Sequence, residues 1–322
     1  MMRKFIFCAS LASAIAFSAA ASAQTVGIAA SKKGSIYDRS ATAIAKVATN
    51  KGGLNATIRN FDSPNVYIPA INKGQVDFGL ANRHEVTIAV EGKEHFEGRK
   101  HTNLRAVAIM YPLRSVFFVK KDSDIKTIRD LKGKTMPGGY VAHKVILMLM
   151  DAVLATEGMT QKDFGSQVPV PNVVAGGNAF IAGKTDGFLF AIGGPKTREA
   201  NAKHGIRALL MENTPENLAA IRKFMPTSYL RLEKPGKASP GVVAPGYSMA
   251  YDALVFGHKG TSDEAAYKLA KAMHDNKADM AKAFPVLNMF NQKSMVKDFG
   301  PVQWHPGAIK FYKEKGLWPP KQ

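Results

Sequence analysis

The sequence predicts an α/β protein made of two similar lobes, with a central ligand cleft between them and two segments that cross from one lobe to the other. One observation is a repeated phrase, Ile71 to Ala81 and Ile181 to Ala191, whose glycine and aspartate recur 109 residues apart. In each copy a helical stretch stops at a glycine, and an aspartate three residues later opens an apolar strand. A second observation is that helices and strands alternate throughout, which is typical of sheets covered by helices.

The first 23 residues read as a secretory signal peptide. Arg3 and Lys4 precede a mostly apolar run over 5–17, and a small-residue cleavage site ends at Ala23. Cleavage after Ala23 predicts a periplasmic protein. Because Cys8 is the only cysteine, the mature chain is expected to have no disulfide and no thiolate nucleophile.

The first unit is expected to start directly after the cleavage site. Glycines at 52 and 53 end its first helix, and Ser63-Pro64 places a capping hydroxyl and a first-turn proline at the start of the second. The expected elements are strands over 25–30, 54–59, 76–81 and 105–110, and helices from Tyr37 and from Pro64.

The second unit repeats this order. Its strongly apolar helix spans about 142–156, and Gly193-Gly194-Pro195 opens a later helix that Gly205 closes. Further strands are expected over 168–174 and 206–211, a helix from Thr214-Pro215, and a loop over 234–246. A capping box at Thr261 then starts a helix toward Phe284.

The extended runs 115–119 and 253–257 are predicted to carry the chain between the lobes. This order makes the first lobe discontinuous. We expect lobe I to comprise residues 24–113 and 251–322, and lobe II residues 114–250.

Composition and motifs exclude several classes of function. The chain has 44 basic and 25 acidic residues, for a net charge of +19, but the lysines are scattered and form no stripe with aromatics. We therefore expect no nucleic-acid partner; the charge is either a solvated surface or a field that favours an anion or an anionic membrane surface. The eight histidines lack paired helical spacing, and no nucleophile elbow is present. No metal, no cofactor and no catalysis are expected.

Several segments together resemble the TAXI family of solute-binding proteins. These are the exported start, the loop before the first helix, both glycine–aspartate phrases, Leu131-Lys-Gly133-Lys134, Gly193-Gly194-Pro195 and the ending Trp304-His-Pro-Gly-Ala308. The resemblance covers essentially the whole mature chain. It implies a type II periplasmic binding protein fold, a small organic anion such as a dicarboxylate or amino acid as ligand, and delivery to the membrane subunit of a TRAP transporter. We expect a monomer.

Candidate ligand contacts in the first lobe lie where strands end and helices begin. The loop containing Ser31, Gly34 and Ser35 precedes a helix amino terminus, which favours a carboxylate. Tyr37 either closes over the ligand or packs on the sheet. Asn82 follows the first repeated strand and stands where the family usually has a polar amide.

In the second lobe the sequence departs from the family. Many TAXI proteins have a serine-glycine-threonine cluster after the first strand, whereas this chain has Gly139-Tyr140 followed by Val-Ala-His143. The change puts glutamate in doubt and makes a smaller, aromatic or differently shaped anion plausible. Gly139 and Tyr140 are predicted contacts, while a helical histidine is commonly packed or solvated.

The remaining candidates lie near the crossings and at the second repeated strand. Gly193 and Gly194 expose backbone at a helix start. Arg114 suits bidentate pairing with a carboxylate, although a surface arginine is the competing interpretation. Tyr247 is the last candidate.

The expected mechanism is capture by lobe closure, after which a membrane carrier recognises the closed form. Two alternatives stay open. A sensory binding protein would present its ligand to a membrane receptor, and an exported enzyme would use a titratable group with a partner in the cleft.

Overall fold

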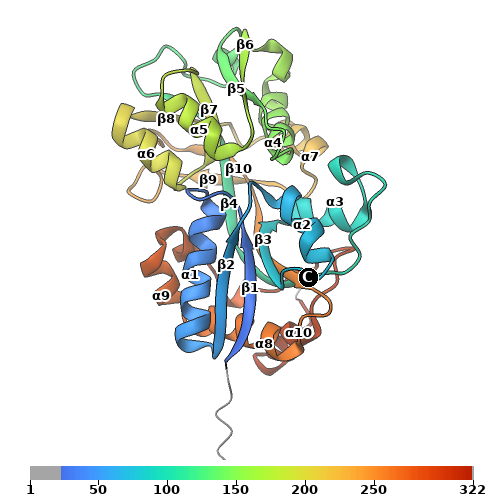
Figure 1. The fold of residues 1–322 in the computed structure, drawn as a ribbon. Helices are drawn as coiled ribbons and strands as arrows, with labels where there is room; N and C mark the ends of the chain where they lie inside the picture. Colours follow the sequence, from blue (N-terminus) through green and yellow to red (C-terminus); the bar gives the residue numbers. More distant parts are fainter. Residues whose placement is uncertain (1–22, 321–322) are drawn as a thin grey trace, which may run out of the picture.

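The computed structural model describes residues 23–320, so the predicted signal peptide lies outside the described residues apart from Ala23. Two lobes, one above the other in Figure 1, are joined by two long strands. This is the two-lobed α/β architecture that the sequence predicts. Between residues 23 and 320 no helix combines the length and the apolar character needed to span a bilayer.

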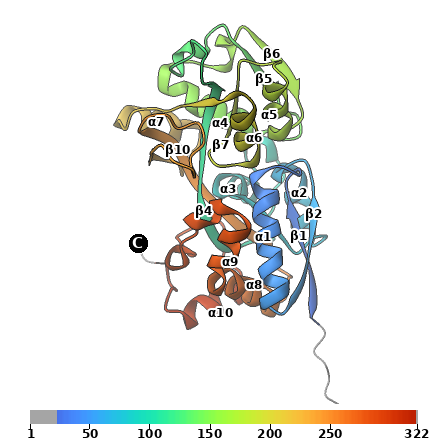
Figure 2. The same ribbon diagram turned by 90° about the vertical axis from the view of Figure 1, so that its left-hand side faces the viewer.

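The lower lobe contains the amino-terminal elements and, returning late in the chain, the carboxy-terminal helices (Figures 1 and 2). Its elements are β1 (Gln24–Ala30), α1 (Ile36–Lys51), β2 (Leu54–Asn60), α2 (Pro64–Asn72), β3 (Phe78–Asn82), α3 (Arg83–Glu91), α8 (Asp263–Asp275), α9 (Lys277–Ala283) and α10 (Pro306–Glu314). Strand β1 pairs in parallel with β2 and β3.

The upper lobe repeats this arrangement. Its elements are β5 (Thr135–Gly139), α4 (Val145–Leu154), β6 (Ser166–Val170), α5 (Val173–Ile181), β7 (Gly187–Ala191), α6 (Pro195–His204), β8 (Ile206–Leu209), α7 (Pro215–Phe224) and β9 (Tyr229–Glu233). Strand β5 pairs in parallel with β6. Strand β7 pairs antiparallel with β4 (Leu104–Lys120), which enters from the lower lobe.

Strands β4 (Leu104–Lys120) and β10 (Gly246–His258) form the connection between the lobes. They pair antiparallel with each other along most of their length. In the lower lobe β10 borders β3, and in the upper lobe β4 borders β7 and β8. The predicted lobe boundaries, 113/114 and 250/251, therefore fall inside these two continuous strands.

The repeated phrase has the same structure in both lobes. Gly74 and Gly183 follow the ends of α2 and α5 with φ of 71° and 73°, the left-handed conformation that favours glycine. Asp77 then accepts a hydrogen bond of 2.8 Å from the amide of Gly27 in β1, and Asp186 accepts one of 2.8 Å from Thr135 in β5. Each aspartate ties its strand to the first strand of its own lobe.

Several predicted elements differ from the observed ones. The strand expected over 168–174 ends at Val170, because Asn172 caps α5 by accepting from the amide of Ala175. The apolar helix starts at Val145 rather than at 142. Strand β9 lies in a region for which no strand was expected, and the helix expected to run to Phe284 is divided at Asn276 into α8 and α9.

The carboxy-terminal phrase has a packing role. His305 caps α10 by accepting from the amide of Gly307, and the hydroxyl of Tyr312 donates to the carbonyl of Val107 in β4 at 2.6 Å. A Cβ atom at Gly307 would lie only 2.0 Å from the carbonyl oxygen of Asp263, the first residue of α8. Only glycine allows α10 to approach α8 this closely.

Replacing Gly307 by alanine is therefore expected to destabilise the protein by about 1–3 kcal/mol, because backbone must move to admit the methyl group. Gly236→Ala is the control, since that glycine has no atom near its Cβ position. Urea unfolding of both variants measures the difference. A Gly307→Ala variant as stable as Gly236→Ala would contradict this account.

Candidate functional site

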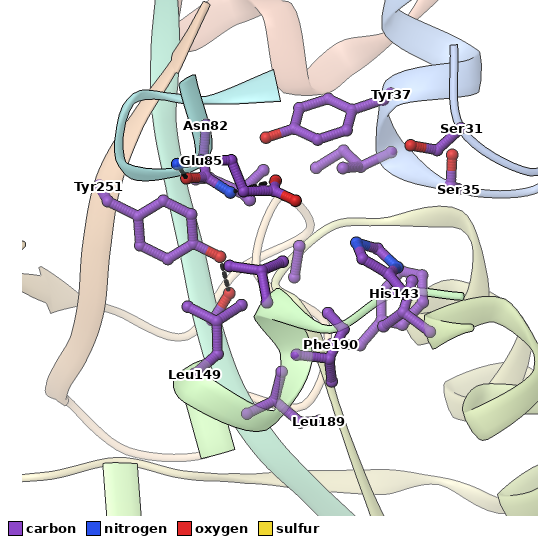
Figure 3. Close-up of a pocket in the computed structure, with 17 residues that line it drawn as sticks. Ser31, Ser35, Tyr37, Asn82, Glu85, His143, Leu149, Leu189, Phe190 and Tyr251 are labelled. Atoms are coloured by element: carbon purple, nitrogen blue, oxygen red, sulfur yellow. Dashed lines mark hydrogen bonds between the residues drawn. The ribbon is translucent and has the colours of Figure 1, made fainter. Parts of the chain in front are cut away.

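A cavity lies between the two lobes, next to the ends of β3 and β7 (Figure 3). The space open to water-sized molecules is about 50 Å³. Since one water needs about 10–15 Å³ measured in this way, the cavity holds a group of only a few heavy atoms. Its walls are formed by Ser31, Ser35, Ile36, Tyr37, Asn82, Glu85, Leu113, Ser115, His143, Val145, Ile146, Leu149, Val173, Leu189, Phe190, Ala191 and Tyr251.

Four helices begin at this cavity. Its walls include the first residues of α1, α4 and α5, namely Ile36, Val145 and Val173, and Asn82, the cap residue of α3. The free amide groups and the positive end of the dipole at a helix start favour negative charge. The backbone therefore contributes a favourable potential for an anion from both lobes.

Glu85 is the acidic side chain at the cavity and is fully buried. Its Oε2 accepts a hydrogen bond of 2.7 Å from Asn82 Nδ2, while its backbone amide donates to Asn82 Oδ1 at 2.8 Å. Its Oε1 has no hydrogen-bond partner. Burial raises the pKa of Glu85 to about 8, although the hydrogen bond from Asn82 acts in the opposite direction.

Two more residues that line the cavity have a buried polar atom without a hydrogen-bond partner, Tyr37 at Oη and His143 at Nδ1. Figure 3 shows the side chains of Tyr37, Glu85 and His143 directed toward the same space from three different elements. Burial raises the pKa of Tyr37 well above its ordinary value. Burial, together with nearby His95, lowers the pKa of His143 to about 3, so this histidine is neutral at physiological pH.

The two lobes contribute different kinds of surface. Ser31, Ser35, Tyr37, Asn82 and Glu85 form a polar wall on the lower lobe, whereas Leu149, Leu189 and Phe190 form an apolar wall on the upper one (Figure 3). None of the described side chains that line the cavity is a lysine or an arginine. Any anion held here depends on uncharged donors and helix starts rather than on a basic side chain.

Tyrosine hydroxyls surrounding the polar wall are already paired with serines. Tyr251 bonds to Ser115 at 2.7 Å, and Tyr111 bonds to Ser40 at 2.7 Å. These pairs satisfy their own groups. Among the described residues that line the cavity, Tyr37, Glu85 and His143 therefore each keep a buried polar atom without a hydrogen-bond partner.

Hydrogen bonds across the cleft hold the lobes together beside the cavity. The amide of Lys144 donates to Asn65 Oδ1 at 3.1 Å, and Asn172 Nδ2 donates to Asp62 Oδ1 at 3.1 Å. The hydroxyl of Ser63 also donates to the carbonyl of Ala142. We name these three contacts the interlobe latch; they connect the start of α2 with the starts of α4 and α5.

Four of the predicted contacts line the cavity: Ser31, Ser35, Tyr37 and Asn82. Gly34 does not line it and instead shapes the loop, with φ of 86° and its amide donating to Asp38. Tyr37 is buried, as its packing interpretation requires, and it also lines the cavity, so its contact with a ligand stays a prediction.

Arg114 does not line the cavity. Its guanidinium is buried, pairs with Glu233 at 2.7 Å and donates to the carbonyl of Ile192 at 3.2 Å. Gly193, one residue further on, faces this guanidinium, and a Cβ at Gly194 would lie 2.7 Å from the ring of Phe190. The chain turns away from the cavity after Ala191, so these three predicted contacts support the turn rather than the cavity.

Tyr140 and Gly139 also lie outside the cavity lining. The ring of Tyr140 is fully buried against α5, where a Cβ at Gly176 would lie 2.7 Å from its hydroxyl. Gly139 and Tyr140 both have positive φ, 80° and 39° respectively, and this sharp turn brings His143 to the cavity instead. Tyr247 pairs with Met211 near the start of β10, while Tyr251, further along the same strand, reaches the cavity.

Sequence reasoning passed over Glu85, Ser115 and Tyr251 as site residues and gave little weight to His143. Glu85 had a detectable signal, because Asn82 followed three residues later by glutamate is a capping pattern that keeps the glutamate beside the cap. The other residues carry no local motif.

A second hollow, of about 610 Å³, contains Arg198, Arg231, Lys234 and Lys237 and reaches the Arg114–Glu233 pair. Both carboxylate oxygens of Glu233 have hydrogen-bond partners, because Ser248 donates to the oxygen that Arg114 does not contact, at 2.8 Å.

Within residues 23–320, no three His, Cys, Asp or Glu side chains gather as a metal-binding group.

Solved structures of other proteins share the fold. A Prochlorococcus marinus MIT 9301 protein, PhnD1 in complex with methylphosphonate, is 10% identical, with a TM-score of 0.54 over 91% of this chain and 98% of its own. A Bordetella bronchiseptica RB50 protein is 14% identical, with a TM-score of 0.52 over 91% and 98%. A binding-protein component of a phosphonate ABC transporter from Pseudomonas aeruginosa is 10% identical, with a TM-score of 0.52 over 83% and 80%.

These similarities establish the two-lobed periplasmic binding protein fold for this chain. The family follows from the sequence itself. A family model described as NMT1-like matches residues 28–316, which include both lobes and the phrase at the carboxy terminus. The chain therefore belongs to the NMT1-like family.

Proposed function

We propose that the protein is an extracytoplasmic solute-binding protein that captures a small organic anion by lobe closure and delivers it to a TRAP-type secondary transporter. The observation that carries the proposal is the cavity between the lobes, where buried Tyr37, Glu85 and His143 each have a polar atom without a hydrogen-bond partner. Buried polar atoms without partners are costly, so a ligand that pairs with them stabilises the closed form.

The anionic nature of the ligand is supported by four helix starts at the cavity and by the net charge of +19. The TRAP partner and periplasmic location rest on the resemblance of the whole mature sequence to TAXI proteins and on the signal-peptide pattern. An ABC-type carrier is the alternative partner, since the Pseudomonas aeruginosa neighbour is a component of an ABC transporter. Adjacency of the gene to a TRAP membrane subunit, rather than to an ATPase, separates the two.

A sensory role uses the same closed form and is separated from transport by the same gene neighbourhood. An enzymatic role would use Glu85 and His143, the carboxyl and imidazole groups at the cavity. Recovery of a bound compound unchanged after long incubation supports binding alone, whereas its conversion would overturn the proposal.

The first expected outcome is a ligand-dependent rise in melting temperature. A ligand at about 100 times its Kd stabilises the folded state by about 2.7 kcal/mol, which corresponds to a shift of several degrees for a chain of this size. Thermal unfolding with monocarboxylates, dicarboxylates, amino acids, aromatic acids and sulfonates measures the shift. If every compound leaves the melting temperature unchanged, the proposed binding function fails.

The second expected outcome concerns the interlobe latch. Asn65→Ala removes the acceptor for the amide of Lys144 without touching the cavity. We expect the calorimetric affinity for the best compound of the panel to fall about fivefold, since one hydrogen bond between the lobes contributes about 1 kcal/mol to the closed form.

Asn55→Ala is the matched control, because that side chain bonds to Thr25 within the lower lobe. Its affinity should equal that of the unchanged protein. Equal affinity in both variants would mean that the latch does not contribute to ligand-dependent closure.

A further inference from the structure

We propose that the cavity selects a short aliphatic monocarboxylate and holds it with one proton shared between the ligand and Glu85. This inference rests on the proposed function and narrows its ligand class. In this arrangement Glu85 donates a hydrogen bond to the ligand, and because Glu85 carries the proton, the ligand binds as a carboxylate anion.

The geometry places the shared proton at one atom. Asn82 donates to Oε2 of Glu85 and so occupies that oxygen, while Oε1 faces the cavity without a partner. A proton on Oε1 lets Glu85 donate a hydrogen bond to an incoming carboxylate. The amide of Asn82 thus orients the carboxyl group as well as capping α3.

The described side chains that line the cavity around Glu85 include no cation that could neutralise a second negative charge, and the helix starts supply only partial positive charge. The charge of Glu85 acts on buried Tyr37 of α1, Tyr67 of α2 and Tyr251 of β10. Neutral His143 faces the cavity from the upper lobe, and no lysine or arginine lies among the described lining residues. Two carboxylates brought together in such a site retain one proton between them. The raised pKa of Glu85, about 8, supports this state.

The other oxygen of the ligand carboxylate also has a donor available. Tyr37 Oη is buried and has no hydrogen-bond partner, and Figure 3 shows the Tyr37 side chain on the same side of the cavity as Glu85. Tyr37 and protonated Glu85 together offer one donor to each carboxylate oxygen. These two donors lie on the polar wall of the lower lobe.

The opposite wall determines the rest of the ligand. Leu149, Leu189 and Phe190 of the upper lobe offer an alkyl chain apolar contacts and offer a second carboxylate no partner (Figure 3). The free volume of about 50 Å³ restricts the alkyl body to a few carbon atoms. The site therefore disfavours dicarboxylates.

The test measures calorimetric binding of propanoate and butanoate between pH 6 and 10, in buffers of different ionisation enthalpy. Below about pH 7 the empty protein already carries the proton, so the Kd should be constant. Above about pH 8 the complex must take a proton from solvent, so the Kd should rise about tenfold per pH unit, with proton uptake visible in the buffer dependence.

Variants assign this dependence to Glu85. Glu85→Gln keeps a donor in place of the shared proton, so it should bind with an affinity that does not change with pH. Glu91→Gln, on the same helix but away from the cavity, should keep the original pH profile. The proton uptake of the unchanged protein decides the question if Glu85→Gln does not fold.

Other outcomes would overturn the inference in distinct ways. Proton release with tighter binding of amino compounds at high pH would mean that Glu85 binds a cation. Binding of dicarboxylates or sulfonates without pH dependence would leave the solute-binding function intact and remove the shared proton. Absence of binding by every anion would remove both.

Discussion

The pairing of β4 with β10 is the constraint on which the rest of the structure depends. Both strands run from one lobe into the other, and each borders a repeated strand, β3 in the lower lobe and β7 in the upper. Because this pairing directs both repeated strands toward the space between the lobes, Asn82 and Ala191 meet at one cavity. The repeated aspartates then hold each strand to its neighbour within its own lobe.

The cavity combines features that are seldom found together. Four helix starts favour an anion, yet the described walls include a buried carboxyl group and no basic side chain. Two neighbouring carboxyl groups in a buried site are stable only when one of them keeps its proton, so the protonation of Glu85 depends on its burial. The interlobe latch holds the two lobes together beside this arrangement.

Local sequence patterns predicted the elements and part of the site. Capping residues, glycines at helix ends and apolar strands identified most helices and strands, and Asn82, predicted from the end of β3, lines the cavity. Gly193, predicted in the same way, does not line the cavity, because the chain turns toward Arg114 immediately after β7. Tyr140 does not line it either, because its ring enters the core of its own lobe.

The amino-acid sequence was enough to predict the duplicated units, the return of the chain to its first lobe and the helix that starts after Ser35, because caps, glycine conformations and strand patterns act over a few residues. Which side chains line the cavity depends instead on tertiary packing. Glu85, His143 and Tyr251 come from distant parts of the chain, and their protonation and free hydrogen-bonding atoms arise from burial between two lobes. Burial between two lobes depends on how the whole chain packs, so a local sequence pattern does not predict it.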